Sequence, residues 1–285
     1  MSVSAGLGEQ RAVSVPAGTI AYRERGAGPP IVFVHGVGVN GDLWREVVPG
    51  LVDRHRCIAP DLPFGAHAHP LRDGTDLSLP GLARIVADFL AALDLDDVAV
   101  VANDTGGAVA QWLAGHHPER ITRLVLTSCD AFEKFPPTPQ RYLTAASRSR
   151  AALWAIARAV QWRPVHRSPL AYGWTTHRPI EPRIMRSYTG PVAREAGVRR
   201  DLRRLLRAVD TRYTYEAADA LRGFDAPALV LWAADDRLFP HEHGRRLADL
   251  LPSGRYEEIA DSRTFIPEDQ PARLSARVAQ FLGPR

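Results

Sequence analysis

The chain has 285 residues, of which 45% are hydrophobic and 24% charged, a composition typical of a globular protein that is long enough for one large domain or two units. Its two cysteines, Cys57 and Cys129, lie in apolar runs and provide no disulfide framework, so we expect buried thiols and a cytoplasmic location. The first ten residues lack the pattern of a secretory signal, and no apolar run reaches the roughly 20 residues that span a bilayer, so no membrane partner is expected.

The net charge of +4 is unevenly distributed along the chain. Residues 134–222 contain eighteen Lys and Arg against six Asp and Glu, whereas the rest of the chain is acidic overall. A basic segment attracts nucleic acid or anionic ligands, or it is a solvated and internally paired helical surface. No nucleic-acid-binding motif accompanies the charge, so the second interpretation is favoured and no nucleic-acid partner is expected.

Strand and helix patterns alternate along the first half of the chain. Period-2 alternation predicts an opening hairpin, and short continuous apolar runs predict strands that are buried on both faces. In chain order, the expected elements are a hairpin at 12–15 and 19–23, strands at 31–34, 57–59, 98–102 and 124–126, and helices at 43–51, after the N-cap Ser78, and at 106–117.

The alternation stops between residues 134 and 222, where prolines separate short arginine-rich segments. We interpret these residues as an inserted helical cap. Alternation then resumes with a strand at 228–232, a helix at 242–251, a strand at 256–259 and a final helix. Repeated strand–helix units predict an α/β fold with a mostly parallel sheet covered by helices, in which residues 1–133 and 223–285 form the core domain.

Three motifs that can carry chemistry follow buried strands, at the sheet edge where ligands bind in such folds. In Val100–Ala108, a strand runs into a turn with Asp104 at its apex, and small residues open the helix behind it, as in a nucleophile elbow. Val34–Gly38 directly follows the first buried strand, and the backbone N–H of Val37 can form an oxyanion hole together with that of Thr105 in the elbow. In Leu231–Pro240, Asp236 follows another buried strand.

In their order along the chain, these three motifs resemble the α/β-hydrolase fold superfamily over nearly the whole chain. The Asn-Asp-Thr-Gly-Gly elbow is similar to the aspartate-nucleophile branch, which includes epoxide hydrolases and haloalkane or haloacid dehalogenases. The resemblance implies an eight-stranded, mostly parallel sheet with a helical cap. It also implies that Asp104 is at the nucleophile position, Asp236 at that of the triad acid, and Val37 and Thr105 at the oxyanion hole. No metal or other cofactor is expected.

Three positions depart from the pattern of that branch. Ala102 replaces a glycine, and Thr105 stands where dehalogenases and epoxide hydrolases usually carry a tryptophan. The position of the catalytic histidine falls at Thr264, before the last helix. A carboxylate can attack an alkyl halide or epoxide unaided, but hydrolysis of the resulting ester needs a base that activates water. Without this base, an ester on Asp104 is expected to persist.

Two enzymatic hypotheses remain, and a non-catalytic binding protein is the third. The leading one is non-hydrolytic chemistry, such as carbon–carbon bond formation, addition, cyclisation or elimination in specialised metabolism, with Asp104 as general acid and base. The alternative is an epoxide hydrolase or dehalogenase-like hydrolase, with Asp104 as nucleophile and another histidine recruited as the base. The expected partner is a hydrophobic, polycyclic or aromatic small molecule, and a homodimer is left open. Candidate substrate contacts are His35, Asp130, Trp154, Trp174 and His177, of which Asp130 is also a reserve triad acid.

Overall fold

The structure is a computed structural model that describes residues 2–283. Its sheet has eight strands in the order β1-β2-β4-β3-β5-β6-β7-β8. The first two pairs in this order, β1 with β2 and β2 with β4, are antiparallel, and the other five pairs are parallel. The strands are β1 (Glu9–Val15), β2 (Gly18–Arg25), β3 (Pro30–Val34), β4 (Arg56–Pro60), β5 (Val98–Asp104), β6 (Ile121–Cys129), β7 (Ala228–Ala233) and β8 (Gly254–Ile259). The predicted eight-stranded, mostly parallel α/β sheet is therefore confirmed.

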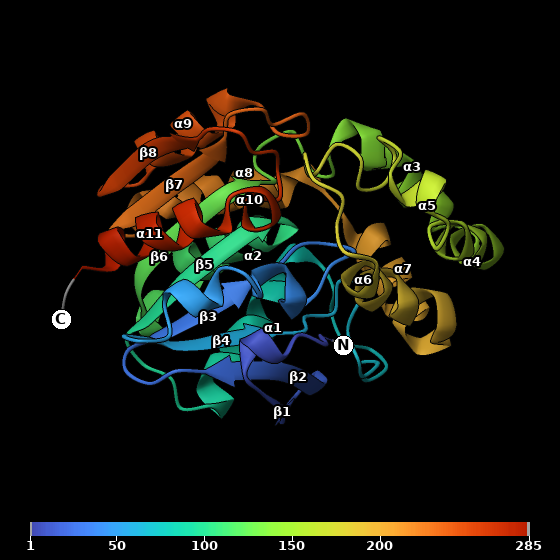
Figure 1. Ribbon diagram of the computed structural model, residues 1–285, viewed down its shortest axis with the longest axis horizontal. Helices are drawn as coiled ribbons and strands as arrows, with labels where there is room; N and C mark the ends of the chain where they lie inside the picture. The colour runs from blue at the N-terminus through green and yellow to red at the C-terminus, as the bar shows by residue number, and fades with distance from the viewer. Residues whose placement is uncertain (1, 284–285) are drawn as a thin grey trace.

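Helices cover both faces of this sheet (Figure 1). Side chains from α1, α2, α8 and α9 pack on one face, and those from α10, α11 and the short helix η2 (Gly41–Trp44) on the other. The helices are α1 (Leu79–Ala92), α2 (Thr105–His116), α3 (Arg141–Ala146), α4 (Arg150–Ala159), α5 (Arg163–His166), α6 (Pro182–Arg194), α7 (Ala196–Ala208), α8 (Thr211–Ala220), α9 (His241–Leu250), α10 (Ile266–Asp269) and α11 (Pro271–Leu282).

Strand β3 illustrates why the central strands read as continuous apolar runs. Ile31 and Phe33 point into the core on one face of the sheet, whereas Val32 and Val34 point into the core on the other. All four side chains are fully buried, so no position of the strand faces water. The predicted helix at 43–51 was wrong, because this stretch forms two short 3₁₀ helices, η2 and η3 (Val48–Gly50). Ser78 caps α1 as predicted.

Helices α3–α7 gather at one end of the sheet, beyond the carboxyl ends of the parallel strands (Figure 1). They lie within the segment predicted to be a cap, residues 134–222. Helix α8 belongs to the same segment, but it packs against α2 on the sheet. No described helix is long and apolar enough to cross a membrane.

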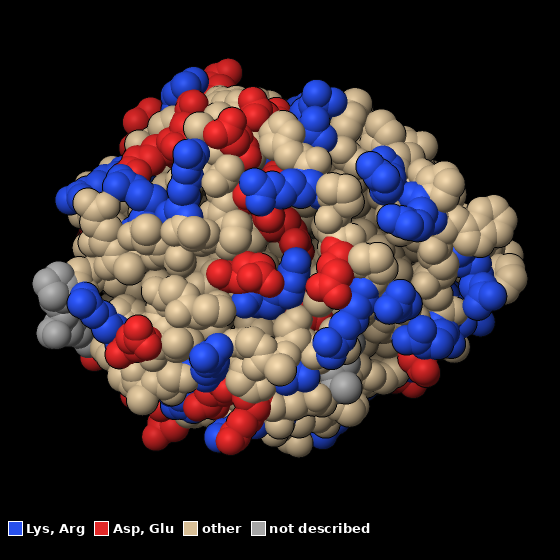
Figure 2. Space-filling model, viewed as in Figure 1, with Lys and Arg blue, Asp and Glu red and all other residues tan. Residues whose placement is uncertain are grey.

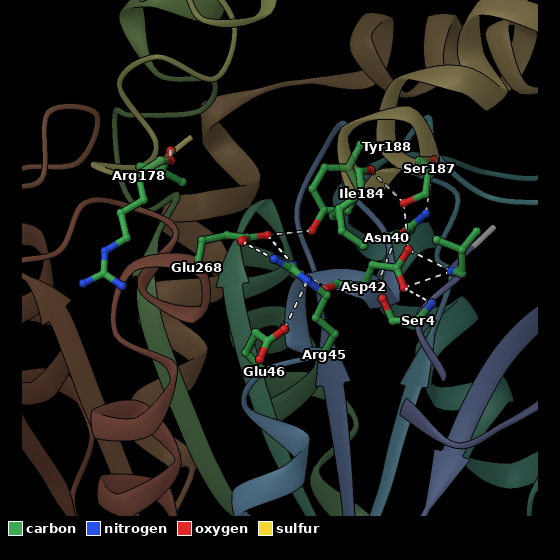
Figure 3. Close-up of polar contacts among 12 residues, drawn as sticks. Ser4, Asn40, Asp42, Arg45, Glu46, Arg178, Ile184, Ser187, Tyr188 and Glu268 are labelled. Atoms are coloured by element: carbon green, nitrogen blue, oxygen red, sulfur yellow. Dashed lines mark hydrogen bonds and ion pairs between the residues drawn. The ribbon is translucent and has the colours of Figure 1, made fainter. Parts of the chain in front are cut away.

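A buried polar network ties α6, which lies in the segment predicted to be a cap, to the core (Figure 3). Arg45 donates to both carboxylate oxygens of Glu268 at 2.7 Å, and the Tyr188 hydroxyl of α6 donates to the same carboxylate at 3.0 Å. Beside this pair, the Ser187 hydroxyl donates to Asp42 at 2.7 Å. Helix α6 is therefore held against η2 and α10, the two elements that flank the loops of the candidate site.

Candidate active site

Asp104 occupies the sharp turn between β5 and α2. Its backbone has φ 56° and ψ −134°, a region that residues other than glycine rarely adopt. The two glycines that follow allow α2 to start this close to the sheet. A Cβ atom on Gly106 would lie 2.4 Å from the carbonyl oxygens of Val34 and His35, and one on Gly107 would lie 2.2 Å from Cβ of Cys129. The strained turn is thus a nucleophile elbow that presents Asp104 at the edge of the sheet.

The backbone N–H groups of Val37 and Thr105, which the sequence predicts to form an oxyanion hole, both act on the same group. The group they bind is the carboxylate of Asp104 itself, which accepts a hydrogen bond from each. Gly36 makes room for this arrangement, because a Cβ atom there would lie 2.1 Å from Oδ2 of Asp104. The carboxylate is therefore held by two backbone donors next to the helix N-terminus.

Burial raises the pKa of Asp104 to about 7, and the negative charge of Asp236 acts in the same direction. The hydrogen bonds from Thr105 and Val37 stabilise the ionised form and oppose the rise. Near neutral pH the carboxyl group is consequently present in both protonation states. A group of this kind can accept or donate a proton with little change in free energy.

Asp236 and Thr264 lie together on two loops at the same edge of the sheet. Oδ1 of Asp236 accepts hydrogen bonds from the backbone N–H groups of Leu238 at 2.8 Å and Phe239 at 3.0 Å, and from the Thr264 hydroxyl at 2.9 Å. Thr264 is fully buried. The threonine therefore bonds the acid that a triad histidine would bond, but its hydroxyl cannot take a proton near neutral pH.

A cavity of about 160 Å³ lies between Asp104 and the cap. Val37, Gly38, Asp104 and Thr105 line it from the core side, whereas most of the side chains that line it from the cap are aliphatic. The cap residues on its wall include Leu143, Leu153, Ile156, Ala157, Val160, Leu170, Val192, Leu202, Leu205, Leu206 and Val209. An engineered apolar cavity of about 150 Å³ in another protein holds benzene, so this one suits a compact molecule or one end of a longer one.

Comparison with known proteins assigns the family. The profile of the alpha/beta hydrolase fold matches residues 29–271. The chain belongs to the α/β-hydrolase fold family. Haloalkane dehalogenase 2 of Mycobacterium tuberculosis is 28% identical, over 93% of this chain and 92% of that protein. A cis-3-alkyl-4-alkyloxetan-2-one decarboxylase of Shewanella oneidensis is 26% identical, over 92% of this chain and 84% of that protein.

Solved structures of α/β-hydrolase fold proteins superpose over almost the whole chain. The haloalkane dehalogenase DbeA from Bradyrhizobium elkani has a TM-score of 0.79 at 21% identity, covering 96% of this chain and 97% of that one. A putative ancestral haloalkane dehalogenase has a TM-score of 0.78 at 25% identity, with 95% and 98% covered. The similarity to dehalogenases fits the aspartate-nucleophile branch that the elbow resembles.

Of the five predicted substrate contacts, none lines the cavity of this α/β-hydrolase fold protein. His35 is buried in the loop after β3, where one ring nitrogen accepts from the Leu62 N–H at 2.8 Å and the other lies 2.9 Å from the Gly36 carbonyl. Burial lowers the pKa of His35 to about 3, so the ring is neutral and supports the loop. His177 pairs with Asp235 at 2.8 Å on the protein surface.

The two predicted tryptophans miss the cavity because of the way the cap packs. Leu153, Ile156 and Ala157 place one face of α4 on the cavity, and Trp154 falls on the other face with 50% of its surface exposed. Trp174 packs against the main apolar core instead. A helical pattern alone cannot tell which face of a short cap helix turns inward, because both faces of α4 carry apolar side chains.

Asp130 lies behind the elbow and is fully buried. Its Oδ2 accepts a hydrogen bond from the Thr105 hydroxyl at 2.7 Å. Burial, together with the negative charge of Asp104, raises the pKa of Asp130 well above its usual value. Asp130 therefore contacts the elbow through Thr105 and lies off the cavity wall, whereas Asp236 is the acid that meets Thr264.

Two further residues that belong to the site were not chosen from the sequence. The side-chain amide of Asn103, the residue before Asp104, donates to the Thr264 carbonyl at 2.8 Å and so anchors that loop. The Tyr172 hydroxyl donates to the Gly38 carbonyl at 2.5 Å, and its ring lines the cavity. Asn103 could have been chosen from the sequence, because it places a polar amide at the end of an otherwise apolar strand. Tyr172 gave no signal beyond being one of several cap aromatics.

Proposed function

We propose that this protein is an enzyme that transfers a proton to or from the apolar part of a small molecule, with Asp104 as general base and general acid. The observation that carries the proposal is the 2.9 Å hydrogen bond from Thr264 to Asp236, which puts a hydroxyl where a water-activating base would stand. A cycle that forms no ester on Asp104 needs no such base. Additions, eliminations, cyclisations and carbon–carbon bond formation, as in specialised metabolism, meet this condition.

The geometry around Asp104 supports proton transfer. A pKa of about 7 leaves part of the population ionised and ready to take a proton at neutral pH. The N–H groups of Val37 and Thr105 hold the carboxylate, so its orientation toward the cavity is constrained before substrate arrives. The apolar side chains of residues 134–222, which we propose as the cap, keep water away from the proton that is moved.

A second candidate is nucleophilic attack by Asp104 on an alkyl halide or epoxide. The comparisons by themselves favour this hydrolytic alternative, because a protein named haloalkane dehalogenase is 28% identical over 93% of the chain. The ester that forms would need a relocated base. His35 is neutral and engaged in its loop, and His177 is held at the surface by Asp235, so neither lies on the cavity wall. The relative named as an oxetanone decarboxylase supports reactions other than hydrolysis on this scaffold.

The first experiment measures general-base chemistry without knowledge of the substrate. A 5-nitrobenzisoxazole opens to a cyanophenolate when a base removes its ring C–H proton and the N–O bond breaks. We expect the wild type to accelerate this reaction with a rate that rises through about pH 7, and Asp104→Asn to lose the acceleration. Equal rates for both proteins would contradict the proton-transfer role and favour a binding protein.

The second experiment separates proton transfer from nucleophilic attack. The protein is incubated with a primary alkyl bromide and with a terminal epoxide, and both its intact mass and the small-molecule products are followed. Release of alcohol or diol over many turnovers would overturn the proposal and support a hydrolase. A persistent adduct that is absent in Asp104→Asn would show a nucleophile that lacks a base, and would replace proton transfer with ester formation as the first step.

A further inference from the structure

A second hollow lies on the outer side of the cap, apart from the cavity above Asp104. Its volume is about 460 Å³, and it is formed by α5, the start of α6, the segment between them and the loop before Thr264. Five of its lining residues are arginines, and none is Asp or Glu. These are Arg163, Arg167, Arg178, Arg186 and Arg263. Figure 2 shows Lys and Arg side chains over the cap on the face drawn.

Most of these arginines have no partner in the part of the chain that the structure describes. The guanidinium groups of Arg163, Arg167, Arg178 and Arg186 make no hydrogen bond or ion pair within residues 2–283. In Figure 3, Arg178 extends away from the Arg45–Glu268 pair, and no contact is drawn from its guanidinium. Elsewhere in the cap, guanidinium groups are used internally: Arg199 donates to the carbonyls of Val192 and Ala193, and Arg203 to that of Ser147.

Within the described residues, the nearby carboxylates bond other groups, and none of them pairs with the guanidinium groups of these four arginines. Asp235 pairs with His177, and Asp269 accepts from the backbone N–H groups of His177, Arg178 and Arg263. Glu181 belongs to the same segment, but it is exposed and does not line the hollow. The pKa of His166 is affected by this positive charge. Its burial and the positive charges of Arg163 and Arg167 lower its pKa, as expected where like charges face one another.

The hollow and the active-site cavity share one residue, Tyr172, which lines both. The hydroxyl of Tyr172 bonds the Gly38 carbonyl in the loop that also supplies the Val37 N–H. A second connection is Arg263, whose guanidinium donates to the carbonyls of Gly173 and Thr176 at 3.0 Å each. Arg263 directly precedes Thr264, so the residue that replaces the catalytic base is adjacent to the wall of the basic hollow.

We propose that this hollow binds the diphosphate group of the substrate, while the apolar, reacting end of the same molecule lies beyond Tyr172 in the cavity at Asp104. Guanidinium groups match phosphate oxygens in charge and in planar, two-pronged geometry. A single carboxylate would engage only one or two of the four unpartnered arginines, whereas a diphosphate has enough charge and oxygens for all of them. A volume of about 460 Å³ holds such a group together with its first linker atoms. The assignment of one molecule to both sites rests on the proposed function; the anion site itself does not.

The test is calorimetric titration of the full-length protein with inorganic pyrophosphate at constant ionic strength. We expect saturable binding to the wild type and at least tenfold weaker binding to the double variant Arg163→Gln/Arg167→Gln. The matched control is Arg141→Gln/Arg158→Gln, which removes the same charge from exposed cap positions outside the hollow and should leave the dissociation constant within twofold. Asp104→Asn should bind pyrophosphate like the wild type, so that a failed chemical proposal remains distinguishable from a failed anion site.

Three results would overturn the diphosphate site. The first is absence of saturable binding to the wild type at millimolar pyrophosphate. The second is equal weakening in the control variant, which would reveal a general effect of net charge. The third is tighter binding of tricarballylate, a tricarboxylate probe of similar charge, which would assign the hollow to carboxylates. Retained melting temperatures of both double variants exclude misfolding as the cause of lost binding.

Discussion

Thr264 donates its hydroxyl hydrogen to Oδ1 of Asp236 at 2.9 Å, so the acid of the candidate triad is already paired with a group that accepts no proton near neutral pH. Two backbone N–H groups, those of Leu238 and Phe239, bond the same oxygen. The loop with Thr264 is further held by the amide of Asn103. Thr264 is thus part of a buried, hydrogen-bonded arrangement at the end of the sheet.

Thr264→His tests whether the rest of a hydrolytic site is intact. A histidine here would meet Asp236 as an orienting acid and could activate water, which is worth about 10²–10⁴-fold in rate. If Asp104 forms an ester with an alkyl bromide, this variant should convert a single turnover into continuous bromide release. The measurement is bromide released per protein over time.

Thr264→Val is the control for the histidine variant. It removes the hydroxyl and keeps a similar side-chain volume, so it should give no continuous bromide release. Thr264 is fully buried and histidine is larger, so the melting temperature of each variant is measured first. A folded histidine variant that forms the adduct yet never releases it would contradict the view that only the base is missing.

Asp104→Asn should stabilise the protein above neutral pH. The pKa of Asp104 is raised from 3.8 to about 7 in the folded state, so the folded protein holds this proton more tightly than the unfolded chain. The free energy of unfolding therefore falls as the pH rises from about 4 to about 7, because ionisation of Asp104 costs more free energy in the folded protein than in the unfolded chain. Removing the charge should recover about 1–3 kcal/mol at pH 8 and little at pH 4, as measured by urea denaturation. A gain of the same size at both pH values would contradict a buried, titrating Asp104.

Asp130 provides a second test of buried carboxyl groups. Burial and the negative charge of Asp104 raise the pKa of Asp130 well above its usual value, and Oδ2 of Asp130 accepts a hydrogen bond from the Thr105 hydroxyl. Asp130→Asn keeps an acceptor for Thr105 and should change the free energy of unfolding by less than about 0.5 kcal/mol. Asp130→Ala leaves the hydroxyl of Thr105 unpaired and should cost about 1–3 kcal/mol. Equal losses in the two variants at pH 7 would show that the charge of Asp130 is required.

The sheet and the elbow could be predicted because short-range patterns encode them, whereas the positions of Asp236 and Thr264 in the site followed from the resemblance to the α/β-hydrolase fold. Apolar runs such as 31–34 report strands buried on both faces, and the Thr-Gly-Gly that follows Asp104 reports a helix that starts against the sheet. The cavity wall could not be predicted. Which side of α4 faces inward depends on how α6 and α7 pack against it, and no local pattern contains that information.

The histidines show the same limit. His177 was a candidate contact by its position in the cap, but its ring is held at the surface by Asp235, a residue 58 positions away. His35 was predicted close to the site and is close, yet its neutral ring supports the Leu62 backbone. The unpaired arginines around the outer hollow are likewise indistinguishable in the sequence from Arg199 and Arg203, which bond backbone carbonyls. The hydrogen-bonding partners in the folded structure, and not the residue type, distinguish these side chains from one another.

Tyr172→Phe tests whether the cap positions the oxyanion loop. The variant loses one hydrogen bond, to the Gly38 carbonyl, and should lower the free energy of unfolding by about 0.5–1.5 kcal/mol. Tyr142→Phe is the matched control, since its hydroxyl also donates to a carbonyl, that of Leu170, at 2.9 Å within the cap. Both variants should therefore lose similar stability, as measured by urea denaturation.

Only Tyr172→Phe releases the loop that places the Val37 N–H on Asp104. Because that N–H lowers the pKa of Asp104, its displacement should shift the pH profile of benzisoxazole opening to higher pH. Identical pH profiles for the two variants would show that Tyr172 only lines the cavity and does not position the loop that supplies the Val37 N–H.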